Sequence, residues 1–130
     1  MATFRAILPL LMLFLTQRGE QINVVHLESL MYPVLARQAQ LQGGVAVDLT
    51  VSSNGEVVAV SAISGHEILR RAATENAKKW KFNEGTERHL RILYDFILVE
   101  PKTDYKPETR NIYDLPNRVQ VISNLAQPQP

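Results

Sequence analysis

The histidines, with the serine and acidic residues around them, are the side chains of this sequence that could carry out chemistry. His26, His66 and His89 lie far apart in three different expected elements, so no pair has the spacing of a metal site. Ser64, His66 and Asp48 can be drawn as a hydrolytic triad. However, no nucleophile-elbow motif surrounds Ser64, and a Ser-Gly-His-Glu run is ordinary at a helix start. We therefore expect no enzyme and no metal site.

The composition removes several further classes of function. Lys and Arg together number 14 and Asp and Glu 13, and the net charge of +1 gives no general attraction to nucleic acid or anionic lipid. The absence of cysteine excludes disulfides, thiolate metal sites and a cysteine nucleophile. No glycine-rich phosphate loop is present, so we expect no cofactor. A chain of 130 residues is long enough for one domain with a hydrophobic core.

Residues 1–19 have the pattern of a secretory signal. Arg5 precedes the apolar run from Ala6 to Leu15, which as a helix would span roughly 15 Å, about half of a bilayer's hydrocarbon core. Pro9 interrupts this run, which disfavours a transmembrane anchor. Gly19 is the one residue suited to precede a cleavage site, so the processing point stays open. We expect export, with membrane contact through an uncleaved N-terminus; a short apolar helix packed on the domain is the alternative.

Strict alternation of apolar and polar residues predicts a strand at 45–52. Two further strands are expected at 57–64 and at 88–100, the latter with one apolar and one mixed face. Asn54 and Gly55 between the first two predict a tight hairpin with a type I′ turn. Helical spacing predicts a short helix over 34–41 and a longer one over 67–81, with an apolar stripe that ends at Trp80. The expected fold is α+β, a small antiparallel three-stranded sheet with two helices on one face.

The expected domain covers residues 32–100, after a lead-in over 20–31. Residues 101–130 form an extension in which 118–122 has the pattern of an additional C-terminal strand, and the tail from Ala126 should be disordered.

Several landmarks in this order resemble the C-terminal domain of TonB-family proteins. They cover 32–99, about half of the chain, and each also has a structural reason, since Pro33 starts a helix and Trp80 fills a core. The landmarks are Tyr32, Pro33, Ala36 and Arg37; Gly44 to Val51 with alternating apolar residues; Asn54 and Gly55; Val57 and Val60; Ser64 and Gly65; Leu69, Ala72 and Ala73; and Trp80 with Phe82.

This resemblance implies a periplasmic module in the cell envelope that grips an extended peptide of an outer-membrane transporter by adding it as a strand to an exposed sheet edge. By position the matching edge is the third expected strand. The partner-binding residues expected there are Arg88, His89, Arg91, Leu93, Asp95, Ile97 and Val99. The alternative is a structural or assembly domain of the envelope, whose edge pairs with a second copy to form a homodimer or with another envelope protein.

The chain departs from a full-length energy transducer. It has no span of about 20 apolar residues and no long proline-rich arm, which puts energy transduction by this chain alone in doubt. We further hypothesise that the extension pairs with a free sheet edge and either caps it permanently or competes with a peptide partner.

Overall fold

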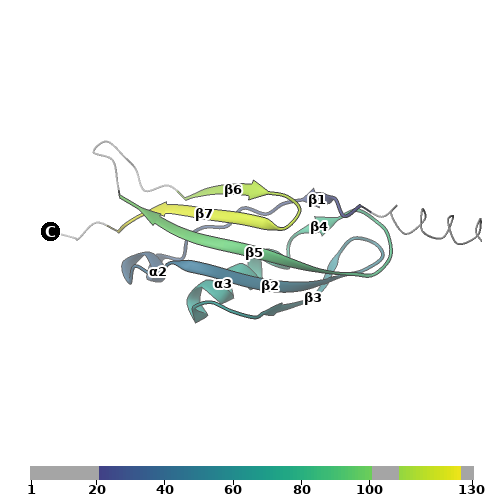
Figure 1. Ribbon diagram of the computed structural model, residues 1–130, viewed down its shortest axis with the longest axis horizontal. Coiled ribbons are helices and arrows are strands. Elements are labelled where there is room, and N and C mark those ends of the chain that lie inside the picture. Colours follow the sequence, from purple (N-terminus) through teal and green to yellow (C-terminus); the bar gives the residue numbers. More distant parts are fainter. Residues whose placement is uncertain (1–20, 101–108, 127–130) are drawn as a thin grey trace, which may run out of the picture.

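The computed structural model describes residues 21–100 and 109–126. Figure 1 shows an elongated fold in which long strands run the length of the molecule. The signal-like segment 1–19, most of the loop after residue 100 and the last residues of the tail lie outside the described residues. No helix of residues 21–100 and 109–126 is both long and apolar enough to span a bilayer.

The main sheet has five strands in the order β3-β2-β5-β7-β6 (Figure 1). Strand β2 spans Gly43–Val51, β3 Val57–Ala62, β5 Arg88–Val99, β6 Arg110–Asp114 and β7 Arg118–Asn124. A separate two-stranded sheet joins β1 (Val24–His26) to β4 (Lys81–Phe82). The expected antiparallel pairs β2–β3 and β2–β5 are present.

The additional C-terminal strand expected over 118–122 is present as β7, and the expectation for the rest of the sheet is wrong in two respects. The extension supplies a second strand, β6, and β7 runs parallel to β5, so the sheet is mixed and not wholly antiparallel. The expected helix over 67–81 is also too long, because α3 spans Glu67–Ala77 and Lys81 and Phe82 instead pair with β1. The short helix α2 spans Val34–Gln38. Lys81 and Phe82 could extend a helical stripe by spacing, and a distant strand decides otherwise.

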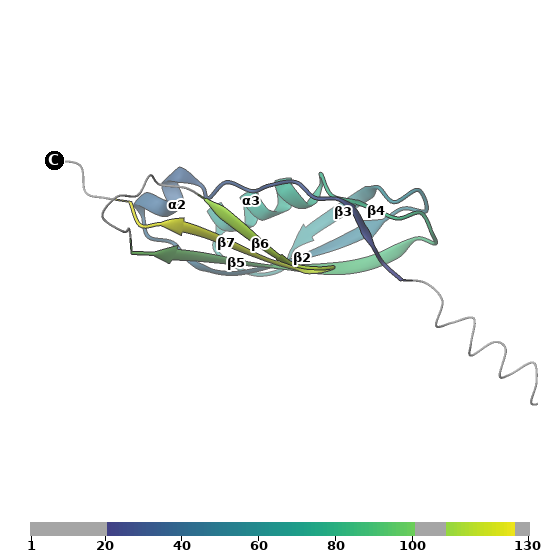
Figure 2. The same cartoon turned by 90° about the horizontal axis from the view of Figure 1, so that it is seen from above.

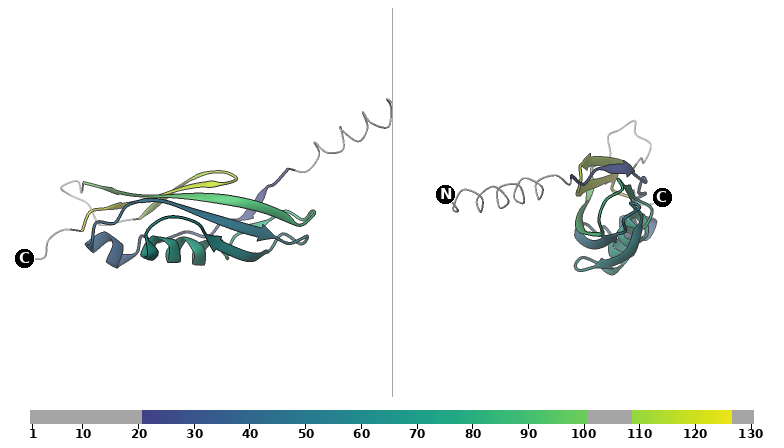
Figure 3. Two further views of the ribbon diagram at one scale, coloured as in Figure 1. Left: turned by 60° about the horizontal axis from the view of Figure 1, so that its bottom comes forward. Right: turned by 90° about the vertical axis from the view of Figure 1, so that its right-hand side faces the viewer.

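Both helices cover one face of the sheet, as Figures 2 and 3 show, and none of the described helices or strands lies over the opposite, open face. Strand residues with alternate spacing point into the core between these layers, including Val47, Leu49, Ile92 and Phe96. Val119 and Val121 of β7 belong to the same core. The C-terminal extension therefore contributes to the core that is formed by residues 32–100.

The β2–β3 hairpin is not the expected type I′ turn. The Gly55 N–H donates to the Ser52 carbonyl at 3.0 Å, and Gly55 has a positive φ of 88° while Asn54 does not. A type I′ turn needs positive φ at both central residues. A Cβ on Gly55 would lie 2.0 Å from the Phe82 carbonyl oxygen, so glycine is required here by close approach as well as by φ.

A buried hydrogen-bond network centred on Asn76 joins the helix, the sheet and the lead-in. Its Oδ1 accepts from Trp80 Nε1 at 3.0 Å and from the Tyr94 hydroxyl at 2.9 Å. Its Nδ2 donates to the carbonyls of Glu28 at 2.9 Å and Ser29 at 3.3 Å. All four hydrogen-bonding positions of this amide are thus used. The network fastens the lead-in across α3.

Because several tyrosine side chains are buried, the free energy of unfolding depends on pH in the alkaline range. Burial raises the pKa of Tyr32 from 10.0 to about 12, and burial also raises the pKa values of Tyr94 and Tyr113. A raised folded-state pKa contributes stability that is complete below pH 10 and is lost as the pH rises from 10 towards 12.

We therefore expect the urea midpoint to fall across pH 10 to 12, with much of the tyrosinate absorbance appearing together with unfolding. The Tyr32→Phe variant should show a weaker dependence. Complete ionisation of all four tyrosines near pH 10 with an unchanged circular dichroism spectrum would contradict this prediction.

Candidate functional site

Strand β5 lies inside the sheet over much of its length. Strand β2 pairs with it from Arg88 to Phe96, and β7 pairs with the opposite side from Leu93 to Val99. The expectation that the whole of β5 is an exposed edge is therefore wrong for Leu93–Val99. The hypothesis that the extension pairs with this edge is confirmed. Within the described residues, no strand pairs with Arg88–Ile92 on the β7 side.

The backbone of β5 presents alternate residues to the β7 side. The Leu93 N–H donates to the Asn117 carbonyl at 2.8 Å, and the Val99 carbonyl accepts from the Leu125 N–H at 2.9 Å. Since backbone groups alternate in direction along a strand, His89 and Arg91 turn their N–H and C=O groups towards that same side. Those two residues offer unpaired backbone groups in the described part of the sheet.

Six of the seven expected site residues carry their side chains on the open face of the sheet, and Arg88 is the exception. This residue is only 9% exposed, and its side chain lies on the helix side. Its Nη1 donates to Asn83 Oδ1 at 3.0 Å, and its Nη2 donates to the Asn83 carbonyl. Arg88 therefore fastens the start of β5, and its guanidinium is not available to a partner. Sequence alternation should have signalled this, since Arg88 has the parity of the buried residues.

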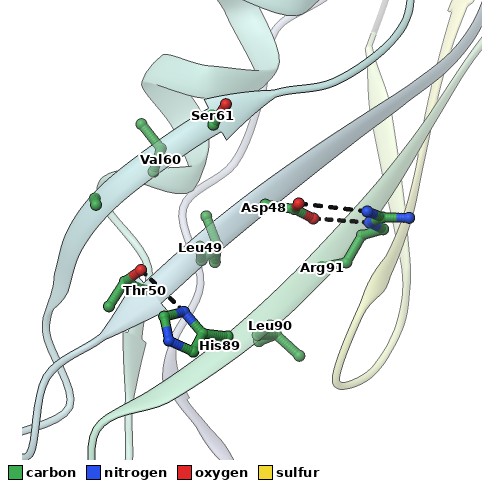
Figure 4. Close-up of a pocket in the computed structure, with 9 residues that line it drawn as sticks. Asp48, Leu49, Thr50, Val60, Ser61, His89, Leu90 and Arg91 are labelled. Carbon is green, nitrogen blue, oxygen red and sulfur yellow. Dashed lines mark hydrogen bonds and ion pairs between the residues drawn. The ribbon is translucent and has the colours of Figure 1, made fainter.

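The side chains on the open face are paired with one another. Arg91 Nε donates to Asp48 Oδ1 at 2.7 Å and Nη2 to Oδ2 at 3.3 Å, and the His89 Nδ1 lies 3.2 Å from Thr50 Oγ1 (Figure 4). The hydrogen bond with Arg91 lowers the pKa of Asp48 below its ordinary value of 3.8. These contacts leave an open pocket of about 480 Å³ above β3, β2 and β5, lined also by Ala59 and Ser61.

Further along β5 the open face is mixed in character. Arg118 Nε lies 3.6 Å from Asp95 Oδ2, while Leu93 and Val99 are each 37% exposed and Ile97 is half-buried. Such a surface can hold backbone and apolar groups of another chain, and it lacks an arranged acid and base.

Two of the three residues considered for hydrolysis, Asp48 and His66, form hydrogen bonds with residues outside the hypothetical triad. Asp48 binds Arg91, and His66 Nδ1 accepts from the Ile68 N–H at 3.3 Å as the N-cap of α3. No hydrogen bond joins Ser64 to either residue in the part of the chain that the structure describes. Asp48 and His66 therefore have structural partners in this fold, and the described residues do not assemble the triad.

The pairing of β6 with β7 is the feature of this site that sequence reasoning missed. Strand β6 (Arg110–Asp114) alternates exposed and half-buried residues, with Asn111 and Tyr113 pointing inward. The sequence does not show this alternation as an apolar face, because the inward residues Asn111 and Tyr113 carry polar groups. The inward-facing Asn111 amide forms hydrogen bonds with the lead-in. It accepts from the Leu30 N–H at 2.7 Å and donates to the Leu30 carbonyl at 2.9 Å.

Comparison with known proteins agrees with the geometry. Residues 28–96 match the family model of the Gram-negative bacterial TonB protein C-terminal domain. The chain is 44% identical over 57 residues to Protein TonB of two Xanthomonas campestris pv. campestris strains, B100 and ATCC 33913. That match covers 42% of this chain and 26% of each relative, so the chain spans about a quarter of their length. None of these names denotes an enzyme.

A solved structure supports the same fold. The solution structure of the Pseudomonas aeruginosa TonB C-terminal domain matches with a TM-score of 0.51 and 20% identity, over 59% of this chain and 86% of that one. At this identity the match concerns the fold alone. The family model covers more than half of the chain, including α2, α3, β2, β3 and most of β5. The chain therefore belongs to the family of Gram-negative bacterial TonB C-terminal domains.

Proposed function

We propose that this protein is a periplasmic binding module that acts in TonB-dependent transport across the outer membrane and holds an extended segment of a transporter. Family membership supports the transport role. The observation that carries the binding mode is the unpaired stretch Arg88–Ile92 of β5, where His89 and Arg91 direct backbone groups outward. Strand addition takes its affinity from such groups. The bound segment would continue the line of β7 towards the start of β5.

The test is an NMR titration of residues 20–130 with peptides copied from the N-terminal segments of outer-membrane transporters of the same organism. We expect shifts confined to Arg88–Ile92, the neighbouring β2 residues and the turn before β7. His89→Pro should weaken binding by about tenfold, because it removes an N–H that makes no bond to β2.

His89→Ala is the matched control, since it removes the same side-chain contact to Thr50 and keeps the N–H. It should bind within about twofold of the parent chain. Silence of all β5 amides at millimolar peptide concentration would overturn this proposal.

A second function, that of an assembly domain of the cell envelope, is supported by a different observation. Strand β7 already occupies the backbone groups of Leu93–Val99, so more than half of the β5 edge is used within the chain. A domain that does not capture transporter peptides needs no open β5 edge. The peptide titration separates the two functions, since an assembly domain would leave β5 unshifted.

A further inference from the structure

The lead-in, residues 21–31, lies on the surface of the domain as an extended segment. Figure 2 shows it running from β1 along the molecule to α2. None of these residues is fully buried, and the short strand β1 pairs with the two residues of β4. Partial burial against the core is limited to Ile22, Val24, Leu27 and Leu30. A segment with so few buried side chains opens locally at a lower free energy than the core does.

Asparagine side chains of the domain hold the main chain of the lead-in. Asn83 Oδ1 accepts from the Asn23 N–H at 3.0 Å, and Asn83 Nδ2 donates to the Gln21 carbonyl at 3.0 Å. The Asn83 N–H donates to the Asn23 carbonyl, also at 3.0 Å. Asn76 and Asn111 bind backbone groups at the other end of the lead-in. Water can replace each of these bonds when the segment lifts, because all of them are made to backbone groups that lie near the surface.

Asn83 also joins the lead-in to the start of β5. Its Oδ1 accepts from Arg88 Nη1 at 3.0 Å as well as from the Asn23 N–H, and its carbonyl accepts from Arg88 Nη2. Arg88 Nε is buried and has no hydrogen-bond partner among the described residues. The guanidinium that begins the unpaired stretch Arg88–Ile92 is therefore held through Asn83, and Asn83 is held through the lead-in.

We propose that residues 21–31 form a strap that opens as a unit while the main sheet stays folded, and that Asn83 couples this opening to the start of β5. In the closed state, Asn23 and Gln21 fix the Asn83 amide, which holds Arg88 in place. In the open state these bonds to the lead-in are lost, and the first residue of β5 is held less firmly. The strap therefore regulates how well ordered the stretch Arg88–Ile92 is.

The effect of the strap on peptide binding rests on the proposed function. A peptide that adds to Arg88–Ile92 binds best to a backbone that is already ordered, so it favours the closed strap. By linkage, a bound peptide stabilises the closed strap to the same extent. The opening of the strap itself does not depend on whether this stretch of β5 binds a peptide.

Native-state hydrogen exchange of the whole chain measures the opening. The Leu30 N–H donates to Asn111 Oδ1 at 2.7 Å, so its exchange reports release of the end of the strap that is remote from Asn83. The N–H groups of Ile92 and Tyr94 face β2, since that of Leu93 faces the β7 side. After correction for intrinsic rates, we expect Leu30 to exchange at least about 100-fold faster than Ile92 and Tyr94. Equal rates would show that the lead-in is released only on global unfolding and would refute the strap.

Asn23→Pro tests whether the strap opens as one unit. It removes the N–H that binds Asn83 Oδ1, and we expect exchange of the Leu30 N–H, at the other end, to become about tenfold faster. Asn23→Ala is the matched control, since it keeps the N–H and removes only an exposed side chain; the Leu30 rate should change by less than about twofold. Ile92 and Tyr94 should be unaffected in both variants. An unchanged Leu30 rate in Asn23→Pro would mean that the two ends open independently, against the proposal.

The Arg88 Nε–H reports the coupling, because it is buried and gives its own nitrogen-edited NMR signal. Its exchange should become faster together with that of Leu30 in Asn23→Pro, and an unchanged rate would refute the coupling through Asn83. Transporter peptides should bind Asn23→Pro several-fold more weakly than Asn23→Ala; equal binding would refute regulation of the site. Failure of the parent chain to bind any peptide would count against the proposed function alone, because the exchange rates still decide whether the strap opens.

Discussion

Ending the chain at Glu108, which removes β6 and β7, is expected to abolish the cooperative fold rather than to open a binding edge. Val119 and Val121 are fully buried, and burial of each such side chain contributes roughly 1.5–3 kcal/mol. The deletion also removes Tyr113, whose ring packs against Trp80 with centroids 6.3 Å apart. The combined loss of about 5 kcal/mol or more equals the whole stability of many domains. Urea unfolding followed by circular dichroism measures it.

Two point variants at neighbouring positions of β7 separate the contribution of side-chain burial from that of strand pairing. Val119→Ala should lower the free energy of unfolding by about 2 kcal/mol, because it leaves a cavity beside the core. Gln120→Ala, on the open face of the same strand, should change it by no more than about 0.5 kcal/mol. A truncated chain with an unchanged urea midpoint and new peptide shifts at Leu93–Val99 would show instead that the hairpin competes with a partner.

Replacement of Asn76 by alanine should be the most destabilising single substitution in α3. It leaves Trp80 Nε1 and the Tyr94 hydroxyl without an acceptor in the core, and it frees the carbonyls of Glu28 and Ser29. An unsatisfied buried polar group costs about 1–3 kcal/mol, so we expect a loss of at least about 3 kcal/mol. Urea unfolding followed by the fluorescence of Trp80, the one tryptophan of the chain, gives the value.

The adjacent Glu75 provides the control for this substitution. Its side chain is 63% exposed and pairs with Lys78 at the surface. Glu75→Ala should shift the free energy of unfolding by no more than about 0.5 kcal/mol. If Asn76→Ala were equally mild, water would have to replace the amide, and the lead-in would not depend on it for its position.

The local elements of this fold could be predicted because their signals are local. Alternation predicted β2 and β5, the turn residues Asn54 and Gly55 predicted the β2–β3 hairpin, and helical spacing predicted α2 and the greater part of α3. The end of α3 could not be predicted this way. Trp80 continues the apolar stripe of the helix, yet the chain leaves the helix because Phe82 pairs with Val24 at the far end of the lead-in. A contact between residues so distant has no signature in a local window.

The face of β5 that carries the candidate side chains was predicted correctly from His89 onward, but the pairing of the β5 backbone was not. The alternate residues from His89 to Val99 do share the open face of β5. Whether their backbone groups are free depends on β7, which returns parallel to β5 after β6. The sequence indicated a strand at 118–122 but could not specify its partner or direction. Period-two patterning defines which face is apolar and carries no information about neighbouring strands.

The sequence by itself determined the family, the α+β class and the alternation that separates core from open face, since each depends on residue types at fixed short spacings. The tertiary structure alone decided the strand order, the parallel pairing of β7 and the burial of Arg88. The physical reason is that edge availability is set by hydrogen bonds between segments far apart in the chain. Those bonds form between backbone groups that every residue type shares.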